Sequence, residues 1–149
     1  MSVVIADASC LILLTNLDKL DILAMIYGDV WITQAVRAEY GLPLPSFISV
    51  HDPIDLVTLN SLLQSLDPGE ASSIALAIEN PGCRIIIDEK KGRRVALSMG
   101  LDLTGTLGVL TEAAKINLLK IDAQVVEKLE FLGFRLSADL KNEFLSGSS

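Results

Sequence analysis

The chain has 149 residues, and hydrophobic residues make up 50% of them, which is enough for a single domain with a core of its own. We expect that domain to span residues 1–145 and to be followed by a disordered tail at 146–149. Lys and Arg number 12 against 19 Asp and Glu, and the resulting net charge of −7 argues against a protein that coats nucleic acid irrespective of sequence.

The sequence also indicates where in the cell the protein is found and whether its cysteines form a disulfide. No run approaches the roughly 20 apolar residues of a membrane helix, and the stretch at 2–6 meets Asp7 without a basic leader. We therefore expect a cytoplasmic protein with no membrane partner. Cys10 and Cys83 fit neither a zinc pattern nor a disulfide framework, so we expect two buried thiols.

Short apolar runs alternate with helical patterns along the chain. The expected strands lie at 3–6, 30–32, 47–50, 84–87 and 101–104, with a further strand or extended piece at 134–136. The expected helices lie at 10–16, 17–27, 34–40, 54–65, 70–79, 90–99, 107–115, 122–132 and 138–145. This alternation is typical of βαβ units, so it predicts an α/β protein in which helices cover both faces of a parallel sheet.

Several of the expected helices begin after a residue that can cap them. Such residues are Ser9, Thr33, Asp52, Asp67 and Ser137. Asp67 is followed by Pro68, and the pair is a strong start signal because Asp accepts the free amide hydrogens of the first turn and Pro tolerates its first position. The helix that begins there carries Glu70 in its first turn.

Four acidic residues stand where a parallel α/β sheet would gather them. Asp7 and Asp88 end the strands at 3–6 and 84–87, and the other two are Glu39 in the helix at 34–40 and Glu70. Carboxylates brought together repel, so they either share protons or bind a hard cation such as Mg²⁺ or Mn²⁺. A single acid at a strand end is more often a helix cap than a ligand, but four acids at matching positions favour the cation.

Basic residues cluster beside the second strand-end acid. Five of the 12 lie within eleven positions, at Arg84, Lys90, Lys91, Arg93 and Arg94. The charge pattern fits a solvated surface as well as a local site for a polyanion. Arg93 and Arg94 are equally suited to contact phosphate or to pair with a carboxylate, and Thr106 to contact phosphate or to cap a helix.

Other kinds of site lack the residues they need. The only histidine, His51, lies in a loop, which leaves a Ser-His-Asp or Cys-His arrangement without a partner set. Neither glycine-rich nucleotide-binding motif is present. A receiver-like domain phosphorylated on aspartate would have a similar sheet, but the chain lacks the strand-end lysine expected after Leu103.

Taken together, these stretches resemble the PIN-domain nucleases, specifically the branch related to the toxin components of prokaryotic toxin-antitoxin modules. The resemblance rests on the order and spacing of the stretches at 3–9, 35–39, 66–71, 85–96 and 104–110. It implies a three-layer α/β/α sandwich with strand order 3-2-1-4-5 and an acidic pocket at the carboxyl edge of the sheet. It also implies Mg²⁺- or Mn²⁺-dependent cleavage of RNA rather than DNA, and a cognate antitoxin protein as partner.

Carried over residue by residue, the resemblance assigns the catalytic acids to Asp7, Glu39, Glu70 and Asp88. Of these, we expect Asp7, Glu70 and Asp88 to bind the metal and Glu39 to act as a general base or to support the ligands. The expected nucleic-acid contacts are Lys90, Lys91, Arg93, Arg94 and Thr106. The chain has Glu at position 70, where the better-known toxins usually have Asp.

A second hypothesis belongs to a different functional class. It is that the chain is a catalytically inactive PIN-like protein that acts by oligomerisation or partner binding, motivated by Glu70 and by the acidic surface. The apolar helices at 10–27 and 125–134 exceed what one small core easily hides. We therefore expect a homodimer or a larger homo-oligomer.

Overall fold

The computed structural model describes residues 3–139 and 141–142. Its strands are β1 (Val3–Ile5), β2 (Asp29–Ile32), β3 (Ile48–Val50), β4 (Arg84–Ile86) and β5 (Asp102–Thr104). They form one five-stranded sheet in the order β3-β2-β1-β4-β5, and every pairing is parallel. This confirms the expected topology. The expected tail at 146–149, and residues 140 and 143–145 of the expected last helix, lie outside the described residues.

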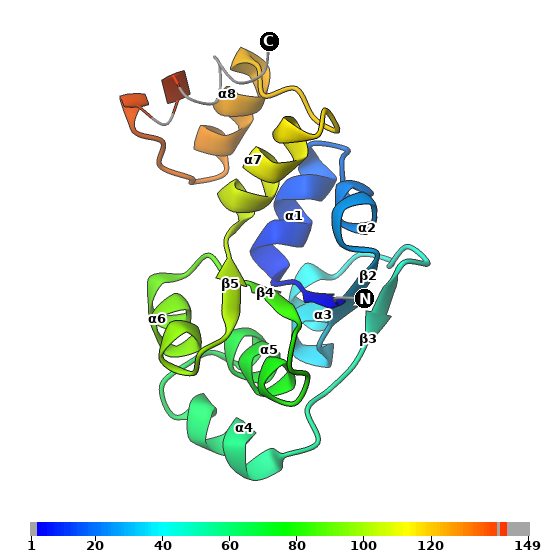
Figure 1. Cartoon of the computed structure of the whole chain (residues 1–149), viewed down its shortest axis with the longest axis vertical. Helices are drawn as coiled ribbons and strands as arrows, with labels where there is room; N and C mark the ends of the chain where they lie inside the picture. Colours follow the sequence, from blue (N-terminus) through cyan, green and yellow to red (C-terminus); the bar gives the residue numbers. More distant parts are fainter. Residues whose placement is uncertain (1–2, 140, 143–149) are drawn as a thin grey trace.

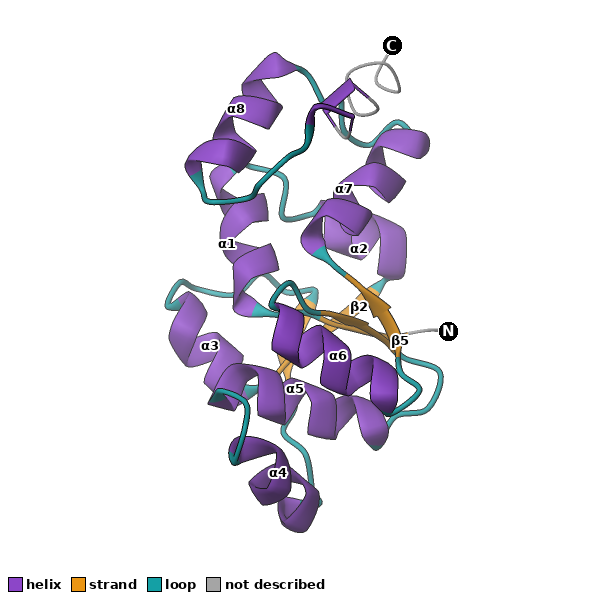
Figure 2. Cartoon of the chain, turned by 90° about the vertical axis from the view of Figure 1, so that its left-hand side faces the viewer, coloured by secondary structure: helices purple, strands orange, loops and turns teal. Residues whose placement is uncertain are grey.

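Helices cover both faces of the sheet. They are α1 (Ala8–Asn16), α2 (Ile22–Tyr27), α3 (Gln34–Tyr40), α4 (Leu56–Leu63), α5 (Pro68–Ile78), α6 (Lys90–Ser98), α7 (Thr106–Lys115) and α8 (Ala123–Phe131) (Figure 1). Figure 2 shows α1, α2, α7 and α8 on one side of the sheet and α4, α5 and α6 on the other. α3 packs against both α1 and α5. The fold is therefore the three-layer α/β/α sandwich that the sequence predicts.

The strands are buried on both faces, which explains their continuous apolar sequences. Successive strand residues point to opposite sides, so Val4 and Ile86 enter the core beneath α1, α2, α7 and α8. Ile5 and Ile85 enter the second core, beneath α4, α5 and α6. All four side chains are fully buried. Two covered faces are expected for a parallel sheet, and the sheet thereby holds the loops at its carboxyl edge on a rigid base.

The structure corrects three of the expected helix starts. Asp7, and not Ser9, caps α1. The helix expected from residue 17 begins at Ile22, because Asp18 turns the chain with a φ of 57°. The cap of α4 is Asp55 and not Asp52, whose Oδ1 instead accepts a hydrogen bond from the Gln34 backbone N–H at 3.0 Å. The segment at 134–136 forms no strand.

The apolar helices that suggested an oligomer pack into the core. Leu11 and Leu14 of α1, Leu23 of α2 and Leu129 of α8 are fully buried in one cluster. Cys10 and Cys83 are buried free thiols, as expected. Within the described ranges, no helix combines the length and the apolar character that crossing a bilayer would need.

Candidate active site

The two strand-end aspartates lie side by side at the carboxyl edge of the sheet. β1 and β4 are neighbours, with Ile5 opposite Ile85, so the residues that follow the two strands leave the same edge. The backbone N–H of Asp88 donates to Oδ2 of Asp7 at 3.1 Å. In an open α/β sheet this edge is where ligands bind.

Asp7 has two structural bonds and an unfavourable electrostatic position. Its Oδ1 accepts the Cys10 backbone N–H at 2.9 Å and so caps α1. Burial raises the pKa of Asp7 from 3.8 to about 7, and the negative charges of Asp88 and Glu39 add to that shift. A carboxylate that is this costly to ionise favours the arrival of a compensating cation.

Thr106 holds the Asp88 carboxyl group. Its backbone N–H donates to Oδ1 of Asp88 at 2.7 Å, and its hydroxyl donates to Oδ2 of the same residue. Thr106 begins α7 and is fully buried. We expected Thr106 to contact nucleic acid, but in the structure it is buried and its two hydrogen bonds go to the Asp88 carboxylate.

Glu70 reaches the site from the first turn of α5, as the sequence predicts. Asp67 caps that helix by accepting the Glu70 backbone N–H at 2.8 Å. Burial raises the pKa of Glu70 from 4.5 to about 8, with further contributions from the charges of Asp67 and Glu89. A side-chain hydrogen bond with Glu89 also contributes to the raised pKa of Glu70.

Glu39 lies at the margin of the cluster. It is exposed near the end of α3. The point that a Cβ added to Gly69 would occupy is 3.7 Å from Oε1 of Glu39, which places this carboxylate beside the start of α5. Its charge contributes to the raised pKa of Asp7. All four predicted acids thus gather in one region of the structure.

The site contains an acid that the sequence reasoning did not assign. Glu89 caps α6, and its carboxylate accepts the Gly92 backbone N–H at 3.3 Å. Hydrogen bonds from the backbone N–H groups of Lys91 and Gly92 lower the pKa of Glu89. Glu89 could have been found from the sequence, because it directly follows Asp88 and stands at a helix start. That position, however, is also the ordinary one for an N-cap.

The basic run divides into different environments. Lys90, Lys91 and Arg94 are exposed on the first turns of α6, whereas Arg93 is half-buried and donates from Nη1 to the Ile87 carbonyl at 2.8 Å. Over residues 3–139 and 141–142, none of these four comes within ion-pair distance of a carboxylate. Their charges therefore remain available to a bound anion.

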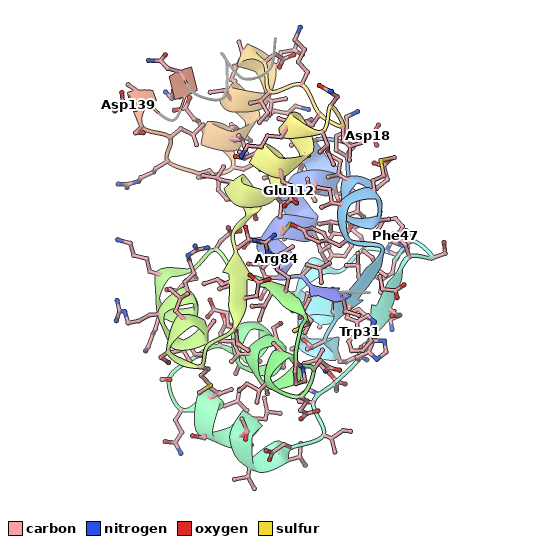
Figure 3. All side chains as sticks on the ribbon, in the orientation of Figure 1. Asp18, Trp31, Phe47, Arg84, Glu112 and Asp139 are labelled. Atoms are coloured by element: carbon pink, nitrogen blue, oxygen red, sulfur yellow. The ribbon has the colours of Figure 1, made fainter. Side chains whose placement is uncertain are left out.

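Arg84 does not belong to the site. It starts β4, at the opposite edge of the sheet, and its Nη1 lies 3.5 Å from Oε2 of Glu112 on α7 (Figure 3). Its Nε lies 3.6 Å from Oδ1 of Asp102, which begins β5. These pairs join α7 to the strands, so the fifth cation of the run is structural.

The donor set fits Mg²⁺ or Mn²⁺ in its chemistry. Every candidate ligand is a carboxylate oxygen, as hard divalent ions prefer, and the pKa values of Asp7 and Glu70 are raised to about 7 and about 8. Among the residues that the structure describes, no three His, Cys, Asp or Glu side chains converge closely enough to form a ready cage. Asp7 and Asp88 are held by hydrogen bonds to the protein instead.

Comparison with known proteins agrees with the fold. A family model described as DUF3368, a PIN domain, matches residues 3–149. No curated protein and no solved structure matches the chain. The matched region includes all five strands and every acid of the cluster. The chain belongs to the PIN-domain family.

Proposed function

We propose that this protein is a metal-dependent ribonuclease that hydrolyses phosphodiester bonds with Mg²⁺ or Mn²⁺. The observation that carries the proposal is the gathering of carboxylates from four separate elements at one edge of a PIN domain. Two of them, Asp7 and Glu70, have pKa values raised to about 7 and about 8. A divalent cation would relieve the repulsion that contributes to those shifts.

The residues of the cluster have separate tasks in this proposal. Asp7, Glu70 and Asp88 hold the cation, and Glu39 takes a proton or supports the ligands. A bound Mg²⁺ or Mn²⁺ supplies a more acidic water and neutralises charge on the scissile phosphate. Thr106 keeps the Asp88 carboxylate oriented through its two hydrogen bonds. The exposed cations Lys90, Lys91 and Arg94 contact the phosphates of the substrate.

The biological role that we propose is that of a toxin whose activity a cognate antitoxin protein restrains. Support comes from the resemblance of the stretches at 3–9 and 104–110 to the toxin branch of the family. An RNA-cleaving centre whose groove lies open beside Asp88 and Glu89 also leaves room for such an inhibitor. Growth arrest on expression, relieved by a protein that co-purifies with the chain, would support the role.

The nuclease proposal is tested with mixed RNA and purified protein. We expect cleavage with Mg²⁺ or Mn²⁺ that a chelator stops, and a loss on the order of 100-fold in Asp88→Asn. The matched control is Asp102→Asn, which removes the same charge at the opposite edge of the sheet, where Asp102 pairs with Arg84. Equal cleavage by wild type and Asp88→Asn would remove Asp88 from the mechanism.

An exposed apolar surface favours a second candidate function, partner binding without catalysis. Ile54, Leu56 and Val57, around the start of α4, are 88%, 62% and 81% exposed. We propose that the same surface forms the contact between copies of the chain in a homodimer or larger homo-oligomer. Light scattering at micromolar concentration measures the mass, and a mass equal to one chain contradicts the oligomer. Absence of cleavage with every divalent ion tested, together with a stable complex, would favour this second candidate over the nuclease.

A further inference from the structure

A groove beside Asp88 and Glu89 has a second wall, which comes from a segment outside the stretches at 3–110 that carry the resemblance seen in the sequence. The groove has a volume of about 780 Å³. One wall comes from the start of α6 and the turn between β5 and α7, and it includes Asp88, Glu89 and Gly105. The other comes from the segment that follows α8, at Gly133, Phe134 and Arg135. Figure 1 shows α6 and this segment on the same side of the molecule.

The backbone at the end of α8 sets the position of the second wall. Gly133 has a φ of 96°, and its backbone N–H donates to the Glu130 carbonyl at 3.1 Å. The backbone N–H of Phe134 donates to the Leu129 carbonyl at 3.0 Å. These two bonds form a Schellman motif, which ends a helix and turns the chain in a defined direction. Phe134 and Arg135 are therefore positioned by backbone geometry.

Apolar packing anchors the same segment on both sides of Arg135. Phe134 packs against the cluster that contains the fully buried Leu129, and Leu136 is 9% exposed within that cluster. Arg135, between them, is exposed. The segment thus presents a partly buried aromatic ring and an exposed guanidinium at adjacent positions, and both line the groove.

The groove has more basic than acidic side chains, although the net charge of the chain is −7. Lys90, Arg93 and Arg135 line it, together with the carboxylates of Asp88 and Glu89. Cations concentrated beside an acidic centre attract a polyanion locally. An aromatic ring next to a cation is the combination that proteins use to hold an unpaired base and its phosphate.

We propose that Phe134 and Arg135 form a positioning site for single-stranded nucleic acid, with Phe134 stacking on an unpaired base and Arg135 contacting an adjacent phosphate. This site deepens the proposed nuclease function and rests on it, because it selects which strand reaches the acidic centre. A duplex cannot stack a base on Phe134 without unpairing it, so the site favours single strands.

The test is binding of fluorescein-labelled oligo(U), oligo(dT) and a duplex, each about ten nucleotides long, to full-length protein with Ca²⁺ in place of Mg²⁺. We expect Phe134→Leu, which keeps an apolar side chain, to weaken single-strand binding about fivefold. Arg135→Ala should lower the slope of log affinity against log salt by about one. The matched controls are Phe131→Leu, at a side chain 88% exposed on α8, and Lys115→Ala, at the end of α7; neither residue lines the groove.

Each outcome separates this inference from the proposed function. Weaker binding in Phe134→Leu and a lower salt slope in Arg135→Ala, without either change in the controls, support the positioning site, and the two oligonucleotides then show whether it prefers RNA. Wild-type binding with no effect of either variant overturns the site while leaving the nuclease proposal standing. Equal affinity for the duplex overturns the stacking. Failure of wild type to bind any of the probes overturns the positioning site, and the cleavage of mixed RNA then decides the nuclease proposal separately.

Discussion

Gly92 shows how one missing side chain shapes the acidic site. A Cβ built on Gly92 would lie 2.8 Å from Oε2 of Glu70 and 3.0 Å from Cγ2 of Ile87. Both separations are shorter than normal van der Waals contact, and Ala would be the better helix former at this position. Glycine in the first turn of α6 is thus explained by the space that the long Glu70 side chain requires.

We expect Gly92→Ala to displace the Glu70 carboxylate and to weaken Mn²⁺ binding about tenfold, measured by titration calorimetry, with the fold intact. The double variant Gly92→Ala/Glu70→Asp should recover part of the affinity, because the shorter acid leaves room for the methyl group. Gly69→Ala is the control, since a Cβ there meets its nearest atom, Asp67 Oδ1, at 3.5 Å. Unchanged Mn²⁺ binding in Gly92→Ala would contradict the idea that Gly92 makes room for a ligand.

At the scale of the element, α1 begins on a residue that is also a proposed metal ligand. Oδ1 of Asp7 caps the helix through Cys10, while Oδ2 accepts the Asp88 backbone N–H. Asn can keep one of these acceptors and Ala keeps neither. We expect both substitutions to abolish cleavage, and Asp7→Ala to have a free energy of unfolding about 1 kcal/mol lower than Asp7→Asn, measured by urea denaturation.

The control for that comparison is Asp122→Ala at the start of α8. Asp122 accepts the Val125 backbone N–H at 3.0 Å and lies outside the acidic cluster. Its loss should lower the free energy of unfolding by a similar amount, about 1 kcal/mol, without affecting cleavage. If Asp7→Asn cleaved RNA as well as wild type, the role of Asp7 would be reduced to capping.

The starts of three helices show where local sequence signals predict the capping residue and where they do not. Thr33 and Asp67 cap α3 and α5 as predicted, because a single good capping residue precedes each helical pattern. Before α1 two candidates stand close together, and Asp7 caps the helix while Ser9 is exposed within it. Local propensity cannot choose between two adjacent caps. The choice depends on where β1 ends, which the pairing with neighbouring strands decides.

The acids of the site were predictable because their positions follow from topology. Once the strand order is known, residues after β1 and β4 must meet at one edge of the sheet. The contributions of Thr106 and of the segment at 133–135 were not predictable in the same way. To predict the role of Thr106, one must know that its hydroxyl donates to Asp88. To predict the role of the segment at 133–135, one must know how α8 packs on the core. Both depend on contacts between residues distant in sequence.

At the scale of the whole molecule, the acidic site makes stability depend on pH. The pKa of Asp7 rises from 3.8 to about 7 and that of Glu70 from 4.5 to about 8. The unfolded chain therefore releases these protons near pH 4, whereas the folded protein keeps them until about pH 7 to 8. Between these limits the folded state binds more protons, so the free energy of unfolding falls as pH rises.

Two other carboxylates act in the opposite direction but in a different pH range. The pKa of Asp55 is lowered by hydrogen bonds from Thr58, and that of Glu89 by backbone hydrogen bonds from Lys91 and Gly92. Their contributions are present above the unfolded pKa values of 3.8 and 4.5 and are lost only as pH falls further. They therefore do not offset the effect of the site between about pH 5 and pH 8.

We expect the metal-free protein to melt at a higher temperature at about pH 5 than at about pH 8.5 in chelator. Mn²⁺ should raise the melting temperature more at the higher pH, because at the lower pH the ion must displace protons from Asp7 and Glu70. Glu70→Gln should flatten the pH dependence and reduce the effect of Mn²⁺, since it removes one of the two carboxyls. Differential scanning calorimetry measures the melting temperature in each of these three comparisons. A metal-free melting temperature that is equal or higher at the more alkaline pH would contradict the clustering of uncompensated carboxylates on which the proposed metal site depends.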